Sequence, residues 1–268
     1  MRIFISVIFG GLDKQQRASD ILNTITFSST EGFDWTDNDS TTEEPWPAAR
    51  YDHAMCYCGD DKVALFGGND NSGKHMTELW LLNTSECHED NLWVKVDTKG
   101  YIRPKQRNTP SIAHLDGNVF LFGKTPRSGG EVELLNLTSH KWERQVTCGE
   151  EPFEQNCQVH PLEKAMKLVT VSNTETSSCG IFNRLDVLDT FTKPMTWSQV
   201  SLDWHGDVTM IPGTRTSFAS TMDSSNGLLF VFGGVQGSSD NEEEGQELLS
   251  TMIVANFSRH HATEDMDG

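Results

Sequence analysis

The sequence predicts an all-β fold made of repeated four-stranded units. Three observations predict it: a short apolar run ending in glycine returns along the chain, a tryptophan follows most of its copies, and a polar residue, usually arginine, precedes them. No segment shows a sustained 3.6-residue period, so we expect little helix. The 268 residues are enough to bury a large core.

The apolar run ending in glycine defines the repeat. The second residues of its five copies are 49 to 61 residues apart, close to the period of about 50 residues that is known for some four-stranded repeats. The fourth copy is decayed and lacks the glycines. The copies are Ile8-Phe9-Gly10-Gly11, Leu65-Phe66-Gly67-Gly68, Leu121-Phe122-Gly123-Lys124, Thr170-Val171-Ser172-Asn173 and Val231-Phe232-Gly233-Gly234.

Two further landmarks keep the same register. A tryptophan follows each of the first four copies by 20 to 27 residues, at Trp35, Trp93, Trp142 and Trp197. A polar residue precedes each of the last four by 15 to 17 residues, at Arg50, Arg107, Asn156 and Arg215. Three landmarks in register are a much more specific signal than one Phe-Gly-Gly motif.

Each unit is predicted to contain four short strands, a to d in chain order. Strand a begins at the polar landmark, strand b ends at the glycines, strand c is the next apolar patch and strand d carries the tryptophan. The c strands are expected at residues 21–27, 78–82, 131–137, 185–188 and 248–255. The units are expected at 1–49 (partial), 50–106, 107–155, 156–214 and 215–257 (partial), with a disordered tail at 258–268.

Such a unit has two apolar faces and cannot bury them alone. Stacking several units around an axis buries both faces, which predicts a β-propeller. Strand b lies inside its unit, so its residues face neighbours on both sides and form a nearly continuous apolar run. One glycine of each pair is expected to adopt a positive φ, and the tryptophan to fill the wider outer part of the packing.

The diglycine after an apolar strand, followed by a tryptophan in the last strand, resembles the Kelch repeat of the galactose oxidase/Kelch-type propeller superfamily. The resemblance covers residues 1–257. The first unit lacks strand a, the fourth lacks the glycines, and the fifth lacks the tryptophan and strand d. Closed Kelch propellers usually have six or seven blades. We therefore expect about four and a half blades here, in an incomplete or open ring formed by a partial chain.

The resemblance implies that the chain binds another protein, through the face that carries the b–c and d–a loops. Several of these loops are long and acidic, at residues 36–49, 148–155 and 233–246, although acidic loops also serve solubility alone. Some Kelch substrate adaptors grip partner carboxylates with arginines at this face. The candidates for partner binding are Arg50, Arg107, Arg215 and His53.

A structural role is the alternative for these candidates: an arginine there can bond loop carbonyls between blades, and His53 can be a buried, hydrogen-bonded residue. If the arginines contact the partner, reversing the charges of Arg50 and Arg107 together should weaken binding without unfolding the chain.

The net charge of −18, from 21 Lys and Arg against 39 Asp and Glu, disfavours nucleic acid and anionic membranes as partners. It favours a partner with a basic segment. No apolar stretch approaches the roughly 20 residues of a spanning helix, so we expect no membrane insertion and a cytoplasmic or nuclear location. An extracellular receptor domain is the alternative, because six cysteines and glycosylation tripeptides occur. The tripeptides begin at Asn38, Asn83, Asn136 and Asn256.

Enzyme chemistry finds little support, and we expect no catalytic residue, cofactor or metal. A galactose-oxidase-like copper site needs a cysteine crosslinked to a tyrosine, but Tyr57 and Cys58 are adjacent in a strand and point to opposite faces. An iron site of the plant-specifier type is the other alternative, and we read its candidates as loop charge. These candidates are Glu150, Glu151, Glu154 and Cys157. Cys56 and Cys58 share one strand face and are expected to be small buried hydrophobes. The leading hypothesis is thus an acidic, non-catalytic scaffold or substrate adaptor.

Overall fold

The computed structural model describes residues 3–28, 32–38, 45–85, 92–100, 102–105, 107, 109–123, 131–152, 157–172, 184–200, 217–236 and 247–257. These residues form strands and one short 3₁₀ helix, η1 (Glu163–Ala165), which confirms the all-β prediction. The chain divides into two compact units, each larger than one predicted repeat: Met1–Arg127 with Glu133–Glu143, and Ser128–Val132 with Arg144–Gly268. From here on, the first and second unit mean these two parts of the chain.

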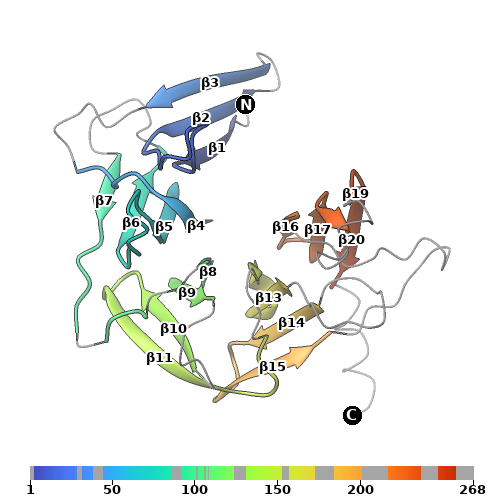
Figure 1. Cartoon of the computed structure of the whole chain (residues 1–268). Helices are drawn as coiled ribbons and strands as arrows, with labels where there is room; N and C mark the ends of the chain where they lie inside the picture. Colours follow the sequence, from blue (N-terminus) through green and yellow to red (C-terminus); the bar gives the residue numbers. More distant parts are fainter. Residues whose placement is uncertain are drawn as a thin grey trace, which may run out of the picture. The chain divides into compact units, whose positions relative to one another are not determined.

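The strands from β1 to β11 form three groups along the chain (Figure 1): a three-stranded sheet, a four-stranded sheet, and four strands of an eight-stranded sheet. The first sheet is β1 (Ile3–Phe9), β2 (Leu22–Ser28) and β3 (Gly32–Asn38). The second is β4 (Tyr51–Tyr57), β5 (Lys62–Asn69), β6 (Leu79–Asn83) and β7 (Trp93–Lys95). The third begins with β8 (Ser111–Leu115), β9 (Asn118–Phe122) and β10 (Glu131–Asn136), and continues into β11 (Lys141–Cys148).

The second unit repeats this arrangement. One sheet is β12 (Gln158–Leu162), β13 (Lys167–Ser172), β14 (Arg184–Asp189) and β15 (Met195–Gln199). The next is β16 (Ala219–Asp223), β17 (Leu228–Phe232) and β20 (Met252–Asn256), beside the short ribbon β18 (Val235–Gln236) and β19 (Glu247–Leu248). The last c strand, expected at 248–255, is therefore divided between β19 and β20. The last two residues of β11 pair in parallel with β15, and this pairing joins β8–β11 and β12–β15 into one eight-stranded sheet.

Strand β5 shows how a thin sheet buries both of its faces. Its side chains alternate between two hydrophobic clusters, as the period of a strand requires. Val63 and Leu65 join a cluster that includes Phe9 of β1. Ala64 and Phe66 join a second cluster with residues of β8, β9 and β10, namely Ile112, Val119, Leu121 and Leu135. The near-continuous apolar run of a b strand is thus explained by two neighbouring sheets, as predicted.

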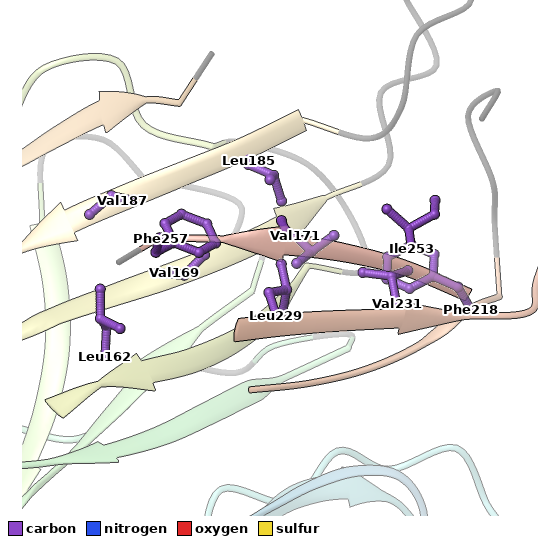
Figure 2. Packing of buried hydrophobic residues seen from close by; sticks show 11 residues of the cluster. Leu162, Val169, Val171, Leu185, Val187, Phe218, Leu229, Val231, Ile253 and Phe257 are labelled. Carbon is purple, nitrogen blue, oxygen red and sulfur yellow. The ribbon is translucent and has the colours of Figure 1, made fainter. Parts of the chain in front are cut away.

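The second unit has an equivalent junction between its two larger sheets. Figure 2 shows Val169 and Val171 of β13 beside Leu229 and Val231 of β17. Phe257, which follows β20, is 5% exposed and closes the same cluster. At about 25 cal/mol per Å² of apolar area removed from water, such junctions are a main source of stability for sheets that have no closed core of their own.

The glycine pairs serve two physical purposes. Both glycines of each complete pair have positive φ, for example 73° at Gly67 and 93° at Gly68, whereas the sequence predicted one of them. The backbone also approaches closely: a Cβ added at Gly10 would lie 2.6 Å from the Arg50 carbonyl oxygen, and one at Gly68 would lie 2.8 Å from that of Tyr51. Glycine is therefore required both for conformation and for space.

The tryptophan landmarks follow the prediction at three positions and depart from it at one. Trp93, Trp142 and Trp197 are at most 6% exposed, whereas Trp35 is 56% exposed. The Trp93 ring contacts Phe9 of the preceding sheet, with ring centroids 5.1 Å apart. Trp35 pairs across the ladder with Ile25, on the face of its sheet that is opposite Phe9 and Leu22. In the part of the chain that the structure describes, no preceding sheet covers this face.

Candidate functional site: a loop surface on the first unit

Two consecutive b–c loops form one surface at the side predicted for partner docking. Residues 12–18 follow the first glycine pair, and residues 69–75 follow the second; together they are called the loop surface here. Each loop folds back on itself through one isolated β-bridge, Leu12–Ala18 in the first and Asn69–His75 in the second.

An aspartate organises the first loop. Asp13 accepts hydrogen bonds from the backbone amides of Gln15 at 2.8 Å and Arg17 at 2.9 Å, and from the Arg17 guanidinium Nε at 2.9 Å. The backbone bond from Arg17 contributes most to lowering the pKa of this carboxyl. The turn is closed by a bond from the Gln16 amide to the Asp13 carbonyl, at 2.9 Å.

The second loop has the same construction, with Asp70 in the equivalent position. Its carboxylate accepts bonds from the backbone amide and hydroxyl of Ser72, at 2.8 and 2.6 Å, and from the amide of Lys74 at 3.0 Å. The hydroxyl bond is the largest cause of the lowered pKa of Asp70. Each loop therefore has a backbone fixed by its own carboxylate, as short Asx turns are.

The two loops are also joined to each other and to the sheet below. The Ala18 amide donates to the Asn71 side-chain oxygen at 2.6 Å. The Arg50 amide donates to the Ser19 carbonyl at 2.9 Å, and the Gly11 amide to the Arg50 carbonyl at 2.8 Å. The side chains exposed on this tied surface are Leu12, Lys14, Gln15, Gln16, Arg17, Asn71, Ser72 and Lys74.

Arg50 lies beneath the loop surface rather than on it, with 0% of its area exposed. Its guanidinium donates to the carbonyls of Ala48 at 3.0 Å and Gly67 at 2.9 Å, and to the Glu78 carboxylate at 3.1 Å. This is the structural alternative that the sequence left open, in which the arginine bonds loop carbonyls. Its role in binding a partner directly stays a prediction.

Glu78 is the centre of this network, and the sequence did not single it out. Besides Arg50, it accepts bonds from the Lys95 ammonium at 2.8 Å and the Trp80 indole at 3.1 Å. Partial burial raises the pKa of Glu78, but the bonds from Lys95, Trp80 and Arg50 outweigh it and lower the pKa to about 2. The spacing between the arginine landmark and the start of strand c is the signal that could have identified Glu78.

The same pairing recurs in the next sheet. Arg107 is 9% exposed and its guanidinium lies 3.0 Å from the Glu133 carboxylate. Both arginines are therefore buried and paired with a carboxylate, which is itself buried at Glu133 and half-buried at Glu78. The geometry now predicts that reversing the charges of the arginines destabilises the fold. Arg215 and the landmark Asn156 lie outside the described residues.

His53 lies between two glycine landmarks. Its ring contacts Phe9 edge-on, with centroids 5.8 Å apart, and its Cβ lies against Gly68. Burial and the nearby Arg50 charge lower the pKa of His53 to about 4, although a bond to the Phe9 backbone opposes them. His53 is thus neutral at physiological pH and part of the packing around the glycines.

The long acidic loops fall mostly outside the described residues, including Asp39, Glu43, Glu44, Glu154, Asp240, Glu242, Glu243 and Glu244. Among those described, Glu150 pairs with Arg184 at 3.1 Å and Glu151 accepts a bond from Thr147. In the described ranges, His, Cys, Asp and Glu side chains do not gather in groups of three or more that could hold a metal. The described residues also contain no helix long and apolar enough to cross a membrane.

A further repeated feature, missed by sequence reasoning, ends the c strands. Asn83, Asn136 and Asp189 each accept bonds from backbone amides two or three residues further on, at 3.2, 2.8 and 2.9 Å. This is the turn chemistry of Asn and Asp. Two of the glycosylation tripeptides, at Asn83 and Asn136, are therefore turn-forming sequences, and the Asn136 amide nitrogen donates to Asn118 at 3.1 Å.

Packed groups of up to four antiparallel strands that follow one another in the chain, with glycine pairs and buried tryptophans in register, define a β-propeller protein. Residues 5–234 match the sequence model of the KLHDC2/KLHL20/DRC7 Kelch-repeats domain. The chain therefore belongs to the Kelch-repeat family.

Two relatives extend this comparison. An F-box/kelch-repeat protein of Arabidopsis thaliana is 27% identical over 119 residues, which are 44% of this chain and 24% of the relative. The matched region thus spans about a quarter of that protein. A solved structure titled "Structure of YjhT" superposes with a TM-score of 0.54 at 14% identity, covering 96% of this chain and 85% of the other. This second likeness concerns the fold.

Proposed function

We propose that this chain is a non-catalytic protein-interaction module that holds a partner protein on its b–c/d–a loop face. The observation that carries the proposal is the preorganised loop surface, in which two loops have their backbones fixed by Asp13 and Asp70 and are tied together by the Ala18–Asn71 bond.

Preorganisation favours binding because less conformational entropy is lost when the partner arrives. Loops held on a rigid scaffold are also where binding functions are usually placed. The carboxylates of Asp13 and Asp70 accept hydrogen bonds within their own loops, whereas Lys14, Arg17 and Lys74 are exposed. The contact therefore suits a partner segment that offers carboxylates or carbonyl oxygens.

The electrostatic field of the whole chain acts at longer range than this local contact and has the opposite sign. With a net charge of −18, the chain attracts a partner that carries a basic segment and accelerates its encounter, an effect that weakens as salt is added. A substrate-adaptor role is the specific form that we propose, because Kelch repeats and an F-box occur together in the matched relative. A cytoplasmic or nuclear location belongs to the same proposal.

The test is to reverse the exposed cations of the loop surface with the triple variant K14E/R17E/K74E. A matched control, K62E/K141E/K164E, makes the same charge change at exposed positions in or directly after the a–b and c–d turns. Proteins that co-purify with the tagged chain are quantified for both variants. We expect a partner to be lost from the first variant and retained by the second, with unchanged circular dichroism. Identical partner sets for both variants would contradict the proposal.

The enzyme alternative has its own measurement. Elemental analysis of the purified chain is expected to show no stoichiometric iron or copper. A metal bound at one equivalent would instead favour a metal-binding Kelch propeller. The extracellular alternative predicts added glycan mass, which an intact-mass spectrum of protein from a eukaryotic host detects.

A further inference from the structure

Two thiols face each other at the end of strand β4. The Sγ atoms of Cys56 and Cys58 are 3.8 Å apart, because residues two apart in a strand point to the same side. Cys58 is 8% exposed and Cys56 is half-buried. Both lie against the cluster that joins the second and third sheets of the first unit. The other described cysteines, Cys148 and Cys157, are far from this pair in sequence.

The surroundings make the two thiols unequal. The hydrogen bond with Cys56 is the largest cause that lowers the pKa of Cys58, and the Ala64 backbone and the Lys62 charge lower it further against the effect of burial. The bond to Cys58 and burial both raise the pKa of Cys56. Cys58 is therefore the thiol that ionises first, and thiolates are the nucleophiles in disulfide exchange.

We propose that Cys56 and Cys58 form a thiol modification site, a dithiol that a small disulfide oxidises reversibly to an intramolecular disulfide. The Cys58 thiolate attacks one sulfur of the small disulfide, whose S–S bond breaks and releases one thiolate that takes up a proton. The Cys56 thiol then loses its proton and attacks the Cys58 sulfur, releasing the second small thiol. Two electrons pass from the cysteine pair to the oxidant, and two protons leave with the two small thiols.

The strand geometry predicts that this bond is easily reversed. Residues two apart in a strand have Cα atoms about 6.6 Å apart, near the upper limit of about 6.8 Å for a disulfide. Closing the bond must therefore bend β4. Among the described strands, β4 lies at the edge of its sheet and is paired with β5 alone, so bending it disturbs one ladder. A strained disulfide is readily reduced by excess thiol.

The experiment uses the reduced, folded chain and the neutral probe hydroxyethyl disulfide, since a neutral oxidant is not repelled by the net charge of −18. After alkylation of the remaining thiols, trypsin releases residues 51–62, which contain both cysteines. We expect this peptide to be unalkylated and lighter by two hydrogens than the dithiol, and to return to the dithiol when dithiothreitol is added.

Two variants serve as controls. In Cys56→Ser the reaction should stop at a mixed disulfide between Cys58 and the probe, whereas Cys148→Ser should behave like the parent chain. The proposal is overturned if the folded parent chain keeps residues 51–62 as the dithiol or as a mixed disulfide, or links either cysteine to another position. The result does not depend on partner binding, so the outcome of this experiment is independent of the proposed function.

Discussion

Arg50 and Glu78 show at the scale of single residues how a repeat landmark acts. The arginine marks the start of strand a in the sequence, but its side chain ends in a buried network that includes the carbonyl of Gly67 and the carboxylate of Glu78. The landmark thus fixes the backbone beneath a loop, and partner contacts fall to the exposed residues above it.

Replacing Arg50 with methionine is expected to lower the free energy of unfolding by about 3 kcal/mol, because the buried guanidinium is lost while its carbonyl acceptors and the half-buried Glu78 carboxylate remain. The matched control is Arg17→Met, whose side chain is 69% exposed and pairs with Asp13; an exposed pair is worth less than about 1 kcal/mol. Urea denaturation followed by circular dichroism measures both. Equal midpoints for the two variants would show that burial adds nothing to the Arg50 pair.

The sequence identified Arg50 and Arg107 as important but not their partners. An ion pair between strand a and the start of strand c depends on which residues the sheet register brings together, and the apolar pattern does not state this. For the same reason the sequence could not tell a partner-binding arginine from a structural one. The glycines were easier to predict, because a positive φ limits the choice of residue directly.

At the scale of the strand and sheet, the tryptophan landmark contributes differently to the free energy of unfolding in different sheets. Trp93 in β7 is 1% exposed between two sheets, whereas Trp35 in β3 is 56% exposed. Among the described residues, the Trp35 indole bonds to nearby polar groups of its own sheet, Asn23 at 3.1 Å and Asp37 at 2.7 Å.

Trp93→Ala is therefore expected to lower the free energy of unfolding by about 3–5 kcal/mol, as large core truncations do. Trp35→Ala should change it by less than about 1 kcal/mol. Chemical denaturation of the two variants under one set of conditions provides the comparison. A similar loss of stability for both would mean that the Trp35 face is covered in solution.

Most strands of this fold follow from the sequence, because apolar runs, glycine pairs and tryptophans repeat in register. The exposure of Trp35 did not follow, since burial of a strand face depends on a neighbouring sheet and is not a property of the strand itself. The turns at Asn83 and Asn136 were overlooked for a different reason: their sequence coincides with the glycosylation tripeptide.

At the scale of the whole molecule, each of the two units contains a histidine that makes the folded state sensitive to acid. His53 in the first unit and His160 in the second both have their pKa lowered to about 4, mainly by burial. His160 is hydrogen-bonded to Ser220 at 2.7 Å, which joins β12 to β16. A buried neutral histidine favours the folded state only while the unfolded chain does not take up the proton.

Stability should accordingly be greatest above pH 6.5 and should fall as the pH drops from 6.5 toward 4, by up to about 1.4 kcal/mol per pH unit for each histidine. The lowered pKa of Glu78 adds a second loss between about 4.5 and 2. Urea titrations at several pH values measure the slope. The double variant H53Q/H160Q should flatten it between pH 6.5 and 5, and an unchanged slope would show that these histidines titrate normally in the fold.

The alternation along β5 has an evolutionary consequence. Because Val63 and Leu65 serve one junction and Ala64 and Phe66 the other, a substitution in one register can be compensated across its own junction without disturbing the opposite one. Each junction can therefore drift separately over generations, while the backbone stays in place. Many different sequences can therefore satisfy the same packing, and a chain that is only 14% identical can share this fold.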